Sequence, residues 1–251
     1  MNLFSRTGIE NKRKQYCQET YLLDWINIEK LDWSKLSANP CAIHVLEANP
    51  KKISFCYLST NSEAVHILEK NPDIIEWVWI SQNTGAMRLI EANLDKIHWG
   101  KLSGNPSAIR LLEENPCKID WCCLSRNPSA IDLLEANPDK IYWNLLSRNP
   151  SAIHLLEENP DKIHWTELSA NPNAMHILEA NPTKIDWFNL SKNPKAISLL
   201  EANPSKIQWY MLSANPSAIH LLEENQDKVI WFNLSGNTSI FDFDKYSVVL
   251  K

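Results

Sequence analysis

A motif of 22 residues repeats along almost the whole chain, and no other feature constrains the fold as strongly. Its consensus is W-x-x-L-S-x-N-P-x-A-I-x-L-L-E-x-N-P-x-K-I-x, as in the stretch WNLLSRNPSAIHLLEENPDKIH that begins at Trp143. Self-similarity at such a period is typical of solenoids, whose units are too small to bury an apolar face alone. The first position of the motif is occupied by Trp33, Phe55, Trp77, Trp99, Trp121, Trp143, Trp165, Trp187, Trp209 and Trp231.

Each unit contains two Asn-Pro steps, and these steps predict where its helices begin. Proline is favoured at the first helical position, and it pushes the preceding residue towards the extended conformation of an N-cap. An asparagine at that place can accept a hydrogen bond from the first turn. The steps therefore predict one helix from Pro150 to Glu157 or Glu158 and a second from Pro160 to Leu168.

Both predicted helices are near two turns long, which is too short for stability in isolation. Apolar residues mark one face of each helix at helical spacing, so neighbouring units must stack to bury them. We expect an all-α solenoid of about ten two-helix repeats, shaped as a rod or superhelix on the order of 90 Å long, with the periodic tryptophans largely buried. The apolar faces consist of Ala152, Leu155 and Leu156 in the first helix and Ile163, Trp165 and Leu168 in the second.

The two ends depart from the consensus and predict three segments. Residues 1–32 are expected to form an N-terminal cap with a degenerate half repeat, residues 33–236 the tandem repeats, and residues 237–251 a C-terminal cap. Ile240 and Phe241 could close the last apolar face, while charged residues after them turn to water as a terminal cap requires.

Composition narrows the classes of function. A net charge of −5 argues against a phosphate-binding surface, and no apolar run reaches the ~20 residues of a membrane span. The N-terminal stretch lacks an apolar signal segment, so we expect an intracellular protein. The 6 cysteines show no metal-ligand spacing, which favours reduced thiols and no cofactor.

A glutamate late in the first helix and a lysine early in the second recur along the repeats. Each sits at the end of its helix that the dipole disfavours, which predicts a compensating contact. One interpretation is a ladder of Glu–Lys pairs, and the other is a lysine stem packed over the tryptophan. The serine before each first asparagine is equally periodic, and a nucleophile needs one special environment, so no catalytic residue is predicted.

The positions that vary between units are the candidates for binding. The residue after Ala-Ile is often a cation or histidine, and we expect this ladder to be exposed. A metal site between neighbouring histidines would lack completing ligands. The candidates in this ladder are His44, His66, Arg88, Arg110, His154, His176 and His220.

A second group of candidates follows the periodic tryptophan. Large aromatic residues occur there outside the consensus, and such residues are enriched at protein interfaces. The alternative is that they pack partly against the next layer. These candidates are Tyr57, Trp79, Phe188, Tyr210 and Phe232.

Units of the form LSxNPxAIxLLExNPxKIxW, with a tail like WxxLSxNxSIF, resemble the short tandem repeats of giant DNA viruses of the Mimivirus kind. The resemblance covers Leu22 to Phe241. It implies a viral origin, in the cytoplasm of the infected host cell or in the virion, and carries no activity with it.

Together these features predict a non-enzymatic repeat scaffold, an adaptor or sequestering factor whose partner is another protein. A structural or spacer component of a virion is the alternative, and a nucleic-acid reader is a third possibility that the acidic balance disfavours. Neither a membrane nor a cofactor is expected.

Overall fold

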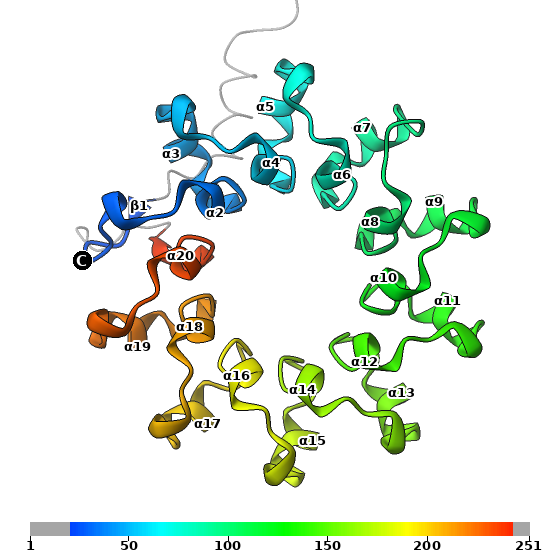
Figure 1. Cartoon of the computed structure of the whole chain (residues 1–251), viewed down its shortest axis with the longest axis vertical. Coiled ribbons are helices and arrows are strands. Elements are labelled where there is room, and N and C mark those ends of the chain that lie inside the picture. The colour runs from blue at the N-terminus through cyan, green and yellow to red at the C-terminus, as the bar shows by residue number, and fades with distance from the viewer. Residues whose placement is uncertain (1–20, 243–251) are drawn as a thin grey trace, which may run out of the picture.

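The repeats close into a ring, as the computed structural model of the chain shows for residues 21–242 (Figure 1). This confirms the predicted all-α repeat solenoid, but the expected rod is wrong. We number the repeats from repeat 1 at Trp33 to repeat 10 at Trp231. The parts of the predicted caps in residues 1–20 and 243–251 lie outside the described residues.

Two concentric circles of short α-helices make up the wall of the ring (Figure 1). The inner circle consists of α2 (Trp33–Ser37), α4 (Phe55–Leu58), α6 (Trp77–Ile80), α8 (Trp99–Ser103), α10 (Trp121–Ser125), α12 (Trp143–Leu146), α14 (Trp165–Leu168), α16 (Trp187–Leu190), α18 (Trp209–Leu212) and α20 (Trp231–Leu234). The outer circle consists of α3 (Ile43–Ala48), α5 (Val65–Lys70), α7 (Met87–Glu91), α9 (Ile109–Glu113), α11 (Ile131–Glu135), α13 (Ile153–Glu158), α15 (Met175–Ala180), α17 (Ile197–Glu201) and α19 (Ile219–Glu224).

Short 3₁₀ turns join the two circles. After the first asparagine of a repeat lie η2 (Pro40–Ala42), η4 (Ser62–Ala64), η6 (Thr84–Ala86), η7 (Pro106–Ala108), η13 (Pro216–Ala218) and η15 (Thr238–Ile240). The turns that follow the second asparagine are η1 (Ile28–Lys30), η3 (Pro50–Lys52), η5 (Pro72–Ile74), η8 (Pro116–Lys118), η9 (Pro138–Lys140), η10 (Pro160–Lys162), η11 (Pro182–Lys184), η12 (Pro204–Lys206) and η14 (Gln226–Lys228).

The predicted helix from Pro160 to Leu168 is wrong as a single element. The chain makes the 3₁₀ turn η10, becomes extended at Ile163 and starts the separate helix α14 at Trp165. The second asparagine explains the difference, because its side chain does not cap the segment that follows it. Asn159 instead donates from Nδ2 to the Leu155 carbonyl at 2.9 Å, and so caps the end of the preceding helix.

The first asparagine of each repeat caps the turn that follows it, and it also links neighbouring repeats. The helix predicted from Pro150 starts later than expected, because α13 begins at Ile153 and its N-cap is Ala152. Asn149 accepts from the Ser151 amide at 3.0 Å and is fully buried. Its Nδ2 donates to the carbonyls of Ser125 and Asn127 in the preceding repeat, at 3.1 and 2.9 Å. A single amide side chain therefore pairs with one backbone amide of the following turn and with two carbonyl groups across the repeat boundary.

The buried serine makes a second link between repeats. Ser147 donates from Oγ to the Trp143 carbonyl at 2.8 Å within its own helix. The same oxygen accepts the amide of His164 at 2.9 Å, and His164 is the residue directly before α14, the inner helix of the next repeat. Buried backbone groups need such partners, so these two side chains fix the geometry of each step.

The apolar core runs around the whole ring between the two circles. The third residue after each tryptophan, the alanine before each outer helix and a leucine or isoleucine within the outer helix are almost fully buried, as at Leu146, Ala152 and Leu156. The tryptophans are partly buried and pack against the edge of this core, so they are less buried than the leucines and alanines that form it.

The periodic lysines lie over the tryptophan faces, as one of the two interpretations predicted. The Lys162 ammonium is 4.4 Å from the centre of the Trp143 ring. The same contact joins Lys52 to Trp33, Lys96 to Trp77, Lys140 to Trp121 and Lys228 to Trp209. Each pair lies within one repeat and joins its inner helix to the 3₁₀ turn near the end of that repeat, or to the same place in the sequence, and the cation covers an aromatic face that the core leaves open.

The seam of the ring repeats the links found between all other repeats. Asn39 donates to the carbonyls of Ser235 and Asn237, and the Asp32 amide donates to Ser235 Oγ at 2.7 Å. Lys30 lies 5.0 Å from the centre of the Trp231 ring. Repeat 10 therefore contacts repeat 1 in the same way as any two repeats in the middle of the chain.

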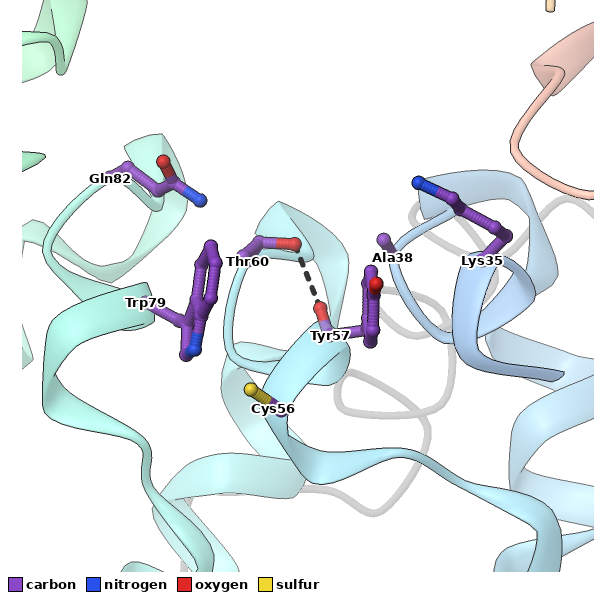
Figure 2. Close-up of a pocket in the computed structure, with 7 residues that line it drawn as sticks. All are labelled: Lys35, Ala38, Cys56, Tyr57, Thr60, Trp79 and Gln82. Atoms are coloured by element: carbon purple, nitrogen blue, oxygen red, sulfur yellow. Dashed lines mark hydrogen bonds between the residues drawn. The ribbon is translucent and has the colours of Figure 1, made fainter. Parts of the chain in front are cut away.

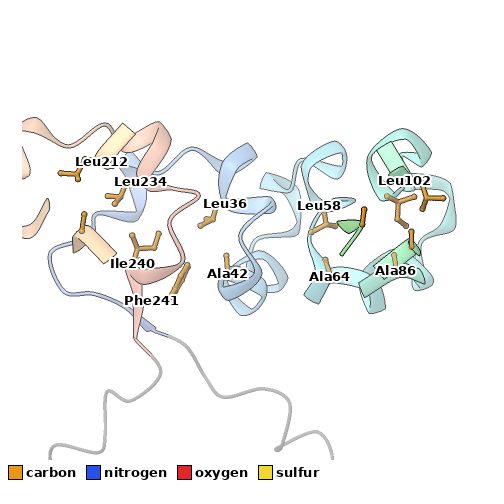
Figure 3. Packing of buried hydrophobic residues seen from close by; sticks show 14 of the residues in the cluster. Leu36, Ala42, Leu58, Ala64, Ala86, Leu102, Leu212, Leu234, Ile240 and Phe241 are labelled. Atoms are coloured by element: carbon orange, nitrogen blue, oxygen red, sulfur yellow. The ribbon is translucent and has the colours of Figure 1, made fainter. Parts of the chain in front are cut away.

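The end segments complete one shared repeat. β1 (Tyr21–Leu22) pairs antiparallel with β2 (Phe241–Asp242). Ile240 and Phe241 are buried next to Leu36 and Ala42 of repeat 1 (Figure 3). Ile240 and Phe241 thus close an apolar face, as predicted, but that face belongs to the seam and is not a terminal surface exposed to water.

The two asparagines of a repeat should differ in their contribution to stability. Asn149→Ala leaves the Ser151 amide and two buried carbonyls without this hydrogen-bond partner. We therefore expect the free energy of unfolding to fall by about 2–4 kcal/mol. Asn159→Ala removes a partly exposed bond and should cost about 1 kcal/mol or less. Denaturant unfolding of both variants checks this order, and equal losses would contradict it.

Ring closure predicts a disulfide between the chain ends. Tyr21 and Asp242 are paired across β1 and β2, where Cα atoms lie about 5.5 Å apart, within the range that a disulfide spans. The double variant Tyr21→Cys with Asp242→Cys should oxidise to an intrachain bond that peptide mapping by mass spectrometry identifies. A matched pair of Tyr21→Cys with Thr166→Cys, across the ring, should not. An open rod would leave both pairs unlinked.

Candidate binding site on the inner face of the ring

The ladder of histidines and arginines lies on the outer helices. Four of its histidines are about half exposed, and His44 is exposed too, which confirms the predicted exposure. These side chains pair with the glutamate of the preceding repeat, in the pairs His66–Glu47 (3.0 Å), Arg110–Glu91 (3.2 Å), His154–Glu135 (2.7 Å), His176–Glu157 (2.8 Å) and His220–Glu201 (3.0 Å). Within residues 21–242 the expected Glu–Lys ladder is therefore wrong.

The other two histidines have a local task at the start of inner helices. His98 and His164 accept the Lys101 and Glu167 amides at 3.2 and 3.4 Å, and so cap α8 and α14. Aspartates cap α2, α10 and α16 in the same position, as Asp120 does for α10. The residue before the tryptophan therefore caps some inner helices but not all, since Glu76, Tyr142 and Ile230 make no such bond.

Three positions of each inner helix face away from the core: the first, second and fifth residues after the tryptophan. We call them the inner-face positions. They lie opposite the buried third and fourth residues on a helix of 3.6 residues per turn. Figure 2 shows several of them, including Ala38, Thr60 and Gln82, on the inner side of α2, α4 and α6.

The predicted aromatic candidates all occupy inner-face positions and are exposed by 37–51%. In the sequence they form two distant groups, one in repeats 2 and 3 and one in repeats 8 to 10. Ring closure joins these groups into one aromatic arc over consecutive repeats. In order around the ring, the arc consists of Phe188, Tyr210, Phe232, Tyr57 and Trp79.

Lysines are interleaved with this arc. Lys35 of repeat 1 lies 5.0 Å from the centre of the Phe232 ring and 5.5 Å from that of Tyr57, and so bridges the seam. Lys101 lies 5.2 Å from the Trp79 ring centre. The rings of Phe188 and Tyr210 stack at 6.3 Å with an interplanar angle of 12°.

The arc contains a pocket of about 400 Å³ between α2, α4 and α6. The rings of Tyr57 and Trp79 stand on opposite sides of it, and Cys56 lies between them (Figure 2). Lys35 and Gln82 flank it towards the centre of the ring. A flat apolar group could enter between the two rings, with a cation and an amide beside it.

Cations gather at the inner-face positions, although the protein as a whole has a net charge of −5. The only acidic residue at these positions is Glu167, which binds Arg148 at 3.3 Å. The basic residues at these positions are Lys35, Lys101, Arg126, Arg148 and Lys192. The inner face therefore has the opposite sign to the whole protein.

The electrostatics of Lys192 show that these cations converge from different parts of the ring. Although its side chain is accessible to solvent, burial by the wall of the ring lowers the pKa of its ammonium. The charges of Arg148, Lys35 and Arg126 lower that pKa further. These three groups come from repeats 6, 1 and 5, so cations of separate parts of the ring lie near enough to act on Lys192.

The aromatic residues of the arc were predicted from the sequence, whereas the cations beside them were not. Lys101 shares its motif position with two of the aromatic candidates, and Arg126, Arg148 and Lys192 occupy the fifth position after the tryptophan, which also varies between units. What could have indicated them is an excess of basic residues at two motif positions, the second and the fifth after the tryptophan. The acidic residues of the outer helices hide this excess in the net charge.

The histidine and arginine ladder does not contribute to this surface. Arg88, Arg110 and the ladder histidines belong to outer helices, whereas the aromatic arc belongs to inner helices (Figure 1). From the sequence, both the ladder and the aromatic residues were predicted to bind a partner. The ring separates them on the two sides of its wall.

The Cys123 thiol on the inner face is not activated as a nucleophile. Burial and the Asp120 carboxylate raise the pKa of the Cys123 thiol, which makes the reactive thiolate scarcer. Within residues 21–242, no three histidine, cysteine or acidic side chains come together as a metal site would need. In the same part of the chain, no helix has the length and apolar character to span a membrane.

Comparison with known proteins adds no relative: no family model, curated protein or solved structure matches this chain.

Repulsion at the centre of the ring predicts that Lys192 costs stability. Its lowered pKa means that the unfolded chain binds this proton more tightly, so stability rises with pH between the folded value and 10.5. At pH 7, Lys192→Met should raise the melting temperature by about 1–4 °C at low salt, a gain of 1 kcal/mol or less. Scanning calorimetry of this variant checks the sign.

The exposed Lys195 provides the matched control, since Lys195→Met removes a charge away from the inner-face positions. The gain for Lys192→Met should shrink in 0.5 M salt, because salt screens the repulsion. A lower melting temperature for Lys192→Met than for the control at pH 7 would contradict the convergence of these charges.

Proposed function

We propose that this protein is a non-enzymatic ring-shaped scaffold that binds a segment of another protein on its inner face. The observation that carries the proposal is the aromatic arc, in which ring closure brings large exposed aromatic side chains of two distant chain segments to the two sides of Lys35. Exposed aromatic residues in a continuous patch are typical of protein interfaces.

Charge complementarity favours an acidic partner segment with apolar side chains. Lys35 and Lys101 lie over rings of the arc, so an apolar group that docks there also meets ammonium ions. Carboxylates on the partner would neutralise them, and opposite charges across an interface raise the association rate and specificity. A segment that alternates acidic and aromatic residues matches this surface.

The pocket between Tyr57 and Trp79 supplies the anchor point. It has the size to take one aromatic or large aliphatic side chain, and a few such anchors carry most of the free energy of binding in protein interfaces. The rest of the arc would add apolar contact on the other side of Lys35.

The resemblance to giant-virus repeats suggests where such a scaffold acts. An adaptor or sequestering factor in the cytoplasm of an infected cell would meet host proteins with acidic segments. The alternative of a virion spacer depended on an extended rod, and a closed ring supports it less.

Selection from a random peptide library displayed on phage tests the proposal. Peptides selected on the complete protein should combine aspartate or glutamate with aromatic residues. Fluorescence anisotropy of a selected peptide should show at least a tenfold loss of affinity, about 1.4 kcal/mol or more, for the double variant Trp79→Ser with Tyr210→Ser.

The matched control is the double variant His154→Ser with His176→Ser, on the outer helices. Its affinity for the selected peptide should stay within about twofold of the parent protein. A selection that yields no common pattern, or a peptide that both double variants bind equally, would refute binding on the inner face.

A further inference from the structure

The cations at the centre of the ring form a cluster that the aromatic arc does not explain. Arg126 and Arg148 come from repeats 5 and 6, which lie outside the arc. Lys192 and Lys35 belong to repeats 8 and 1 and also occupy inner-face positions, so all four side chains face the space that the closed ring surrounds (Figure 1). The cluster is therefore assembled by the ring, because no two adjacent units of the sequence contain all four groups.

These charges have little compensation within the protein. Arg148 binds Glu167, and both side chains are about three quarters buried, so this guanidinium is held in place. Within residues 21–242, Lys35, Arg126 and Lys192 have no carboxylate within 4 Å. Like charges that converge without counter-charges repel, and a bound anion would relieve this repulsion.

We propose that the centre of the ring binds a compact polyanion of the phosphate type, held by Arg126, Arg148, Lys192 and Lys35. The cations approach from separate repeats, so the ligand must present negative charge in several directions at once. Phosphate groups on a small framework do so at high charge density.

Arginine favours phosphate over other partners. The planar guanidinium presents parallel N–H donors that match two phosphate oxygens, and lysine adds point charges from other sides. An extended acidic peptide carries one charge for each side chain and spreads these charges along its length. The convergent geometry therefore favours a small polyphosphate over the protein segment that occupies the aromatic arc.

This site goes beyond the proposed function, since a small anion and a protein segment use different side chains. Lys35 borders both surfaces and is left unchanged in the experiments. Loss of peptide binding by arc variants and loss of anion binding by cation variants can then be measured independently.

Isothermal titration calorimetry on the whole protein tests the proposal with myo-inositol hexakisphosphate and with tripolyphosphate. We expect one saturable site per ring for at least one of the two, with affinity falling as salt increases. The same ligand should raise the melting temperature, because it binds the folded state alone. Benzenehexacarboxylate, with comparable charge on carboxylates, should bind at least about tenfold more weakly.

The double variant Arg126→Gln with Lys192→Gln should lose about 100-fold in affinity for the phosphate ligand, roughly tenfold for each cation. The matched control is Arg88→Gln with Arg110→Gln, which removes the same net charge from outer helices and should change affinity less than about threefold. Circular dichroism and melting curves establish that both variants fold.

Several results would overturn the inference. One is the absence of binding for both phosphate ligands at low salt, and another is an equal loss of affinity in the two double variants. Tighter binding of an acidic peptide or of a single-stranded oligothymidylate than of either phosphate ligand would assign the cations to a protein or nucleic-acid partner. Peptide binding to the arc would be unaffected by the first two results.

Discussion

The fold depends on one buried amide that does three things at once. The first asparagine of each repeat caps the following turn through Oδ1 and donates from Nδ2 to two carbonyls of the preceding repeat, as Asn149 does. Aspartate has no donor for these carbonyls, and glutamine would place its amide one bond too far. Because a buried group with missing partners is costly, every step must adopt the same geometry. Identical steps turn the chain by the same angle each time, and a constant turn without insertions can return the chain to its start.

Closure removes the problem that open solenoids have at their ends. An open stack exposes an apolar face at each terminus and needs a polar cap over it. Here the half repeat at Tyr21–Asp32 and the segment that ends at Asp242 together form one unit, and Asn39 makes the same bonds across the seam as Asn149 makes in the middle. The seam has no covalent bond, so its stability comes from the same buried contacts that hold adjacent repeats together.

The sequence predicted what is local and missed what accumulates over the whole chain. The period, the helix starts at the first asparagine and the exposed histidines follow from propensity and spacing. The ring does not, because a small difference in rotation per repeat separates a rod from a closed circle. The second asparagine was wrongly predicted to start a helix, because an asparagine such as Asn159 can cap either the helix before it or the one after it. The extended conformation of Ile163, which ends the following turn, shows that Asn159 caps the helix before it. The converging cations were missed for the same reason as the ring, since Arg126 and Lys192 are 66 residues apart in sequence.

The wall of the ring divides the variable residues by their freedom to change. On the outer helices the histidines and arginines contact the glutamate of the preceding repeat, as His154 contacts Glu135, so these positions still serve the stacking of repeats. At the inner-face positions, the links that fix each step are made by the neighbouring serine and asparagine, and side chains such as Tyr57 or Arg126 are free of that task. A ring built in this way can change its inner face without changing its frame. The aromatic arc and the converging cations both use this freedom, and closure gives them their final arrangement by joining repeats that the chain keeps apart.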